Sequence, residues 1–348
     1  MNALPRCRIA VLPKTPGLKT ALKRGALLAA ANWPLVIAQF VAESSLKLLL
    51  AVPIVGGAFL VMLLLDTSLT DLLSGDVRTG VMSILGALTA SPAALVAFVA
   101  AGLLVLVGGS VLTFVVKAGT VAVLAEAERT AGPIERPPLR FESLRRAAVS
   151  GIDPFLAGCA RLGRRYVRIG LGLLLLYTLT AGVYLLFVLG GYTLAGNSAV
   201  LLGWTVLAAL ASSALVVWIT ILNFFYLMTQ MVVAIEDVSV RIGVRLALQF
   251  VWGHLREVAA VFGVVLVVVV MATAASILAT AGLGLIAFVP LVGLAVLPLQ
   301  LAAWLLRGIV FEYLALAGLG AYMSHYRWYH RGAETQPPLR EVPGIRLA

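Results

Sequence analysis

Five ionisable side chains lie inside long apolar runs of the sequence, where charge is costly: Glu43, Lys47, Lys117, Arg307 and Glu312. A charge at bilayer depth costs about 2.5–3.5 kcal/mol or more, so such groups face water, a ligand or an opposite charge. Glu43 and Lys47 are four residues apart and can pair on one helix face. For the other three we expect partners on other helices, such as Glu312 for Lys117.

Uncharged polar side chains occur in the same runs, and together with the charges they predict a polar cavity between helices. The predicted ligand-binding residues are Lys117, Asn223, Gln230, Gln300, Arg307 and Glu312. A cavity of this composition suits an anionic lipid headgroup or a small anionic solute. The alternative is structural, because such groups also join helices through hydrogen bonds or extend towards the membrane surface.

The overall composition is that of an integral membrane protein. Of 348 residues, 61% are hydrophobic and 12% are charged. A soluble protein needs about a quarter of its residues charged to cover its surface. The formal net charge of +11 suits a surface that faces anionic headgroups.

Six apolar runs are long enough to cross about 30 Å of hydrocarbon, which takes about 20 helical residues. Continuous apolar runs without alternation predict helices rather than barrel strands. The fold class predicted is therefore an all-α, polytopic membrane helix bundle with six transmembrane helices. The runs are Trp33–Leu65, Pro92–Leu124, Tyr166–Leu189, Ala199–Ile235, Val258–Leu283 and Pro290–Met323.

The basic residues predict the orientation. Nearly all of them precede the first run, follow the last, or lie between the second and third or the fourth and fifth. The opposite side holds only Arg78, beside Asp66, Asp71 and Asp76. The positive-inside rule then places both termini in the cytoplasm, and we expect the inner membrane of a bacterium. An aromatic belt is predicted at the inner face from Tyr322, Tyr326, Trp328 and Tyr329.

The same order of parts occurs three times, as a basic, mildly amphipathic segment followed by two spans. The leading segments are Gly17–Ala31, Phe141–Ile152 and Ser239–Trp252. Repeat units of about 15–128, 139–237 and 238–326 follow, within a single domain 1–332 and before a disordered tail 333–348. Alternatively, any three hairpins of apolar sequence look alike. Two spans also end similarly, in Val121–Glu126 and Met231–Glu236.

The leading segments have the pattern of helices that lie in the headgroup layer. The arginines expected to contact lipid headgroups are Arg145, Arg146, Arg164, Arg165, Arg241 and Arg245. Their place beside the membrane makes anionic lipid, rather than nucleic acid, the expected partner. Protein partners in the membrane are possible. Small residues four apart, such as Ala317 and Ala321, predict close helix packing.

The phrase Ala234–Gly253 (AIEDVSVRIGVRLALQFVWG), which follows a long span, carries a resemblance to a known type of membrane domain. It resembles, with the overall layout, bacterial six-helix membrane families such as the domain attached to some glycerophosphoryl diester phosphodiesterases. The chain has no room for the phosphodiesterase barrel. The resemblance therefore implies a membrane-resident domain without catalysis of its own.

Motifs of catalysis and metal binding are absent from the sequence. Two cysteines and three histidines occur without zinc-site spacing, and no phosphate loop or nucleophile elbow is found. We expect no metal and no cofactor. The function predicted is non-enzymatic handling or transport of a lipid or small anionic solute. The alternatives are a structural or accessory subunit of a membrane complex and, less favoured, an intramembrane lipid-modifying enzyme.

Overall fold

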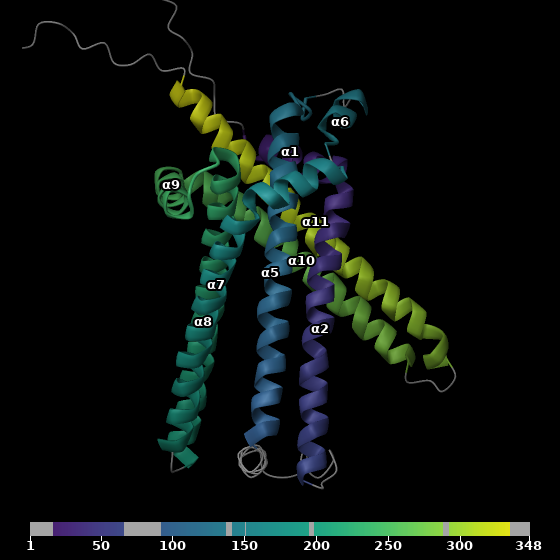
Figure 1. Ribbon diagram of the computed structural model, residues 1–348, viewed down its shortest axis with the longest axis vertical. Coiled ribbons are helices and arrows are strands. Elements are labelled where there is room, and N and C mark those ends of the chain that lie inside the picture. The colour runs from purple at the N-terminus through teal and green to yellow at the C-terminus, as the bar shows by residue number, and fades with distance from the viewer. Residues whose placement is uncertain are drawn as a thin grey trace, which may run out of the picture. The chain divides into compact units, whose positions relative to one another are not determined.

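A computed structural model describes residues 17–65, 92–136, 141–149, 151–194, 198–287 and 292–334 (Figure 1). Its regular structure is entirely helical in these ranges, which confirms the predicted all-α class. The helices are α1 (Leu18–Ala31), α2 (Trp33–Leu65), α5 (Pro92–Thr130), α6 (Phe141–Ala147), α7 (Ile152–Leu194), α8 (Ser198–Glu236), α9 (Val240–Gly253), α10 (Leu255–Ala287) and α11 (Val292–Glu334).

Six of these helices, α2, α5, α7, α8, α10 and α11, are long and apolar enough to cross a membrane. Each overlaps one of the six predicted runs, so the six-span membrane protein is confirmed. The helices continue past the apolar runs: α7 begins at Ile152, well before Tyr166. Its 43 residues measure about 65 Å, twice the thickness of the hydrocarbon. Hydropathy marks only the part of a helix that lies in lipid.

Short helices precede the spanning pairs at the predicted places. They are α1, α6 and α9, which correspond to the three leading segments. The order of parts is thus observed, while an internal threefold repeat stays a prediction. The basic residues before position 17, the acidic turn with Asp66 and Asp71, and positions 335–348 of the tail lie outside the described residues.

The chain divides into two compact units. Unit 1 comprises the described residues of 1–33, 124–149 and 245–348, and unit 2 those of 34–123 and 150–244. The boundaries fall inside α2, α5 and α9, so these helices contribute to both units. The three predicted repeat units do not follow this division and remain a prediction.

Unit 1 is held by a close crossing of α1 on α11, with α10 packed along α11. A Cβ built on Gly25 would collide with the Ala317 carbonyl and the Ala321 backbone nitrogen. Only glycine therefore allows the two helices to approach this closely. The small residues predicted to allow close packing at Ala317 and Ala321 lie at this crossing.

Unit 2 is packed at one end of its long helices. Gly119 of α5 and Gly158 of α7 lie against each other, since a Cβ on Gly158 would lie 3.2 Å from the Gly119 Cα atom. On α7 the buried residues end at Gly170, and on α8 they begin at Met228. Among the residues of both helices whose burial is described, none of the others is buried, which leaves apolar side chains to contact lipid.

Candidate functional site

The six predicted ligand-binding residues are divided between the two units. Lys117, Asn223 and Gln230 belong to unit 2, while Gln300, Arg307 and Glu312 belong to unit 1. Neither unit alone contains the whole predicted cavity, and the pairing of Lys117 with Glu312 stays a prediction.

In unit 1, Arg307 is exposed, and its guanidinium carbon lies 5.8 Å from the centre of the Phe311 ring one turn along α11. Gln300 and Glu312 are half-buried. In unit 2, Asn223 is exposed on α8, whereas Lys117 is half-buried and Gln230 is fully buried. Gln230 is therefore the one fully buried residue of the six, while Lys117, Gln300 and Glu312 are half-buried.

Lys117 lies over an aromatic ring in unit 2. Its Nζ atom is 5.4 Å from the centre of the Tyr226 ring, a cation–π contact between α5 and α8. Among the described residues, Lys117 takes part in no ion pair. Its positive charge is thus balanced by a ring alone within the described part of unit 2.

Gln230 follows Tyr226 by one helical turn, and its side chain is 0% exposed. Neither polar atom of its amide makes a hydrogen bond of normal geometry to a described residue. The Tyr166 hydroxyl from α7 donates to the Gln230 backbone carbonyl at 2.7 Å and fixes this turn of α8. The Tyr226 hydroxyl is close enough to interact with this amide through a hydrogen bond. The remaining capacity of the amide is where a ligand or water would bind, because a buried polar atom left without a partner costs about 1–3 kcal/mol.

The carboxylate of Glu43 in unit 2 already has partners. Glu43 of α2 lies 3.8 Å from Lys47, which confirms the predicted pair, and accepts a hydrogen bond of 3.4 Å from Gln39. Glu43 is also close enough to Tyr226 to interact with it electrostatically. We refer to Gln39, Glu43, Lys117, Tyr166, Tyr226 and Gln230 as the Lys117 cluster.

A buried ion network lies in unit 1 and was not predicted. Glu128 of α5 is bound by two arginines: Arg24 Nε lies 3.1 Å from its Oε1 atom, and Arg327 Nη1 lies 3.0 Å from its Oε2 atom. Arg24 also contacts Glu135 at 2.8 Å, and Lys23 donates to the Glu135 carbonyl at 2.9 Å. The network joins α1, α5 and α11.

The same arginines bind backbone carbonyls near the end of α5. Arg24 donates to the Glu128 carbonyl at 3.1 Å, and Arg327 donates to the Ala125 carbonyl at 2.8 Å. The Glu128 carbonyl is among the last of α5 and lacks a helical partner, whereas the Ala125 carbonyl lies one turn earlier. Both lie near the negative end of the helix dipole, which cations stabilise. The network therefore has a complete structural explanation and needs no ligand.

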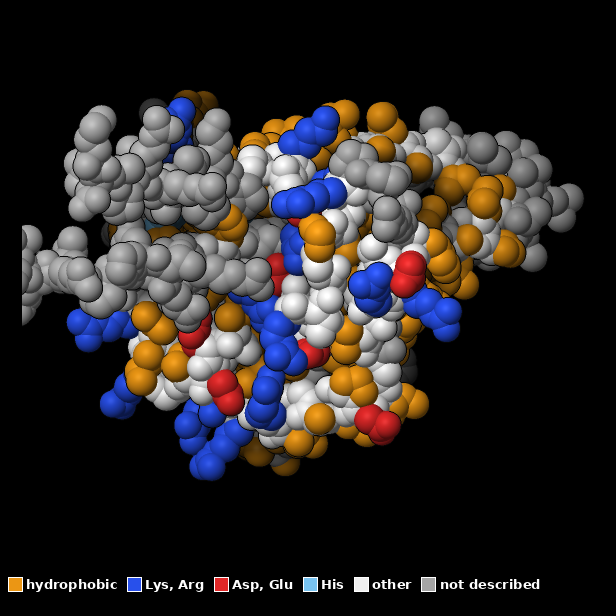
Figure 2. Space-filling model, turned by 90° about the horizontal axis from the view of Figure 1, so that it is seen from above, with side chains coloured by type: hydrophobic (Ala, Val, Ile, Leu, Met, Phe, Trp, Pro, Cys, Tyr) orange, Lys and Arg blue, Asp and Glu red, His pale blue; other side chains and the backbone are white. Residues whose placement is uncertain are grey.

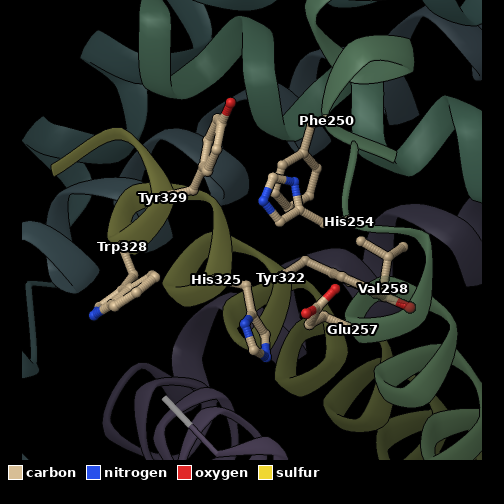
Figure 3. A pocket seen from close by; sticks show the side chains of 8 residues that line it. All are labelled: Phe250, His254, Glu257, Val258, Tyr322, His325, Trp328 and Tyr329. Atoms are coloured by element: carbon tan, nitrogen blue, oxygen red, sulfur yellow. The ribbon is translucent and has the colours of Figure 1, made fainter. Parts of the chain in front are cut away.

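A small pocket in unit 1 lies between α9, α10 and α11 (Figure 3). The His254 ring stacks on Phe250 at 5.6 Å and meets the edge of Tyr329 at 4.4 Å. His254 Nδ1 and His325 Nε2 are buried without hydrogen-bond partners among the described residues. The cavity volume of about 20 Å³ is enough for about one water molecule.

The aromatic belt predicted on α11 is only partly exposed. Tyr322 and Tyr326 are 3% and 1% exposed, so they belong to the core of unit 1 and do not face lipid. Tyr329 is 41% exposed and can reach an interface. Phe250 of α9 packs on both tyrosines at this end of α11, with its ring centre 5.1 Å from that of Tyr326 and 6.3 Å from that of Tyr329. Hydropathy does not distinguish such a core face from a lipid face.

The arginines predicted to contact headgroups lie mainly on the surface. Arg145, Arg146, Arg164, Arg241 and Arg245 are exposed, and Arg165 is half-buried. Two of the six are paired: Arg146 lies 3.2 Å from Glu142, and Arg165 contacts Asp237. In the view of Figure 2, Lys and Arg side chains are seen beside hydrophobic side chains.

The described residues contain no group of three or more His, Cys, Asp or Glu side chains that could hold a metal ion. No family model, no curated protein and no solved structure matches this chain.

Proposed function

We propose that the protein is a non-enzymatic, multi-pass membrane protein that binds an anionic group at the Lys117 cluster of unit 2. The bound group is a phosphate or carboxylate, carried by a lipid headgroup or a small solute. The resemblance to a membrane domain without catalysis of its own agrees with this role. We place the protein in the bacterial inner membrane, with both termini in the cytoplasm.

The proposal rests on the surroundings of the Lys117 side chain. Lys117 is half-buried in an apolar helix, and its ammonium group lies over the Tyr226 ring. A cation held in this way costs free energy unless an anion approaches it. Glu43 is a weak candidate for that anion, because Gln39 and Lys47 already bind its carboxylate oxygens.

Gln230 supplies the polar groups that complete such a site. Its buried amide carries two N–H donors and one acceptor, of which one is directed to the Tyr226 hydroxyl, and it lies one turn from the ring beneath Lys117. A phosphate or carboxylate accepts hydrogen bonds strongly from an ammonium group and an amide together. The pair Lys117 and Gln230 therefore favours an anion over a cation or a neutral sugar.

The test is ligand-induced stabilisation of the purified protein in a neutral detergent. Phosphatidylglycerol and inorganic phosphate are the two probes, and they separate a lipid source from a free anion. We expect one of them to raise the Tm of the wild-type protein, and Lys117→Met to lose most of that increase. Methionine keeps the length of the side chain and removes its charge.

Lys19→Met is the matched control, because Lys19 is an exposed lysine on α1, outside the Lys117 cluster. It removes the same charge and should leave the increase in Tm unchanged. The proposal is wrong if neither probe stabilises the wild-type protein, or if the two variants lose stabilisation equally. Retention of both variants in the membrane shows that folding is intact.

A second role, as a structural or accessory subunit, rests on the exposure of the spans. The most apolar windows of Ile152–Thr193 and Val200–Glu236 are 0% buried. Lipid or another membrane protein covers these faces. Cross-linking in native membranes separates the two: a defined adduct with another protein at α7 or α8 supports the accessory role, and lipid adducts alone oppose it.

A further inference from the structure

Three arginines form a stripe on one face of α7. Arg161, Arg164 and Arg168 are separated by three and four residues, a spacing that places them on the same side of a helix over about 10 Å. All three side chains are exposed. None of them forms an ion pair with any residue that the structure describes.

Arg164 and Arg168 point away from the packed side of α7. Gly158, Tyr166 and Gly170 are buried on that packed side. At 100° per residue, they lie on the side of the helix opposite Arg164 and Arg168. Arg164 and Arg168 therefore lie on the outer side of unit 2, while Arg161 lies nearer the packed side, close enough to Tyr166 to interact with it electrostatically.

Leucines follow the arginines on the same face of α7. Leu171, Leu175 and Leu179 follow Arg168 at helical spacing and are 37%, 70% and 63% exposed. From Leu171 to Leu179 the helix rises about 12 Å, which fits within one leaflet of about 15 Å. Along this outward face of α7, charged arginine side chains are thus followed by apolar leucine side chains.

The length of α7 places this change at the membrane boundary. From Leu171 to Tyr192 the helix rises about 32 Å, close to the thickness of the hydrocarbon. Tyr192 is 53% exposed, as expected for a tyrosine at the other interface. Arg168 then lies about 5 Å beyond the hydrocarbon, at the depth of the headgroups, with Arg164 about 6 Å and Arg161 about 11 Å further along the helix.

We propose that this face binds one anionic phospholipid along its length. The phosphate lies between Arg164 and Arg168, with Arg161 next to it, and an acyl chain lies on Leu171 and Leu175. Guanidinium groups bind phosphate oxygens in bidentate geometry, and three of them without carboxylate partners favour a headgroup with net negative charge. The site is separate from the Lys117 cluster, which lies inside unit 2.

Photo-cross-linking tests the site directly. A photoreactive amino acid replaces Leu175 in the full-length protein, reconstituted in vesicles of equal phosphatidylglycerol and phosphatidylcholine. Val217 on α8 is the matched position, because it is 58% exposed and equally far from the α7–α8 hairpin. We expect the phosphatidylglycerol-to-phosphatidylcholine ratio of the adducts to be at least about fivefold higher at 175 than at 217.

Two sets of substitutions separate a site from general surface charge. Arg161→Gln, Arg164→Gln and Arg168→Gln together should abolish the enrichment at 175. Lys19→Gln, Arg136→Gln and Arg256→Gln remove the same charge from exposed positions elsewhere and should preserve it. Equal ratios at 175 and 217, or equal loss in both triple variants, overturn the proposal. Lys117→Met should not change the enrichment, so this proposal and the proposed function can fail separately.

Discussion

Gly25 of α1 and Gly320 of α11 meet so closely that a Cβ on Gly320 would lie 3.0 Å from the Gly25 Cα atom. A Cβ on Gly25 would collide with backbone atoms of α11, which cannot move aside as a flexible side chain does. We therefore expect Gly25→Ala to separate the helices and to lower stability by about 1–3 kcal/mol. Thermal unfolding in detergent measures the loss.

Gly263→Ala is the control for that substitution. Gly263 lies inside α10 of the same unit, and a Cβ there would meet nothing within 4 Å. Alanine is the better helix former, so this variant should be as stable as the wild-type protein or slightly more so. A Gly25→Ala protein with unchanged Tm would show that the α1–α11 crossing is looser than described.

Glu128→Gln should destabilise unit 1 strongly. The Glu128 side chain is 5% exposed, and Arg24 and Arg327 are 15% and 14% exposed. Removing the central charge leaves two largely buried guanidinium groups facing a neutral amide, at a cost of about 3 kcal/mol. The expected result is a lower Tm and less protein in the membrane.

The neighbouring Glu126 supplies the comparison. It pairs with Arg129 on the same helix at 2.6 Å, but these side chains are 40% and 66% exposed. Glu126→Gln should cost at most about 1 kcal/mol, since exposed pairs contribute little. If the two variants lose equal stability, the Glu128 network does not hold the unit together.

Asn32 connects the turn between α1 and α2 to the segment after α6. Its Nδ2 atom donates to the Ala147 carbonyl at 2.9 Å, and its Oδ1 atom accepts from the Val149 backbone nitrogen at 3.0 Å. Asn32→Ala leaves both backbone groups without these partners, at a cost of about 1–3 kcal/mol. Gln249→Ala, which removes an exposed amide on α9, should change Tm little.

The spans could be predicted from the sequence because lipid imposes a length and a composition on each helix. The short helices α1, α6 and α9 could also be placed, from their basic and amphipathic pattern. The ends of the spanning helices that lie nearer the basic segments could not be predicted. Helices such as α7 and α11 continue outside lipid, where hydropathy no longer marks them.

Which charged side chains pair with one another could not be predicted from the sequence. Arg24 and Glu128 are 104 residues apart and were two among many charges beside the spans. Glu126 and Glu128 look alike in sequence, yet one is exposed and the other buried, because only one faces α1 and α11. The pair of Glu43 and Lys47 was predictable because one helix brings both groups together.

The orientation of the chain gives the last prediction. Fusions of green fluorescent protein to either end should fluoresce, and alkaline phosphatase fused there should be inactive, because both ends are predicted to be cytoplasmic. Alkaline phosphatase inserted near Arg78, on the predicted outer side, should be active. Six spans require both ends to lie on one side of the membrane. Ends in different compartments would therefore contradict the number of crossings, whereas reversed activity at all three sites would contradict only the orientation.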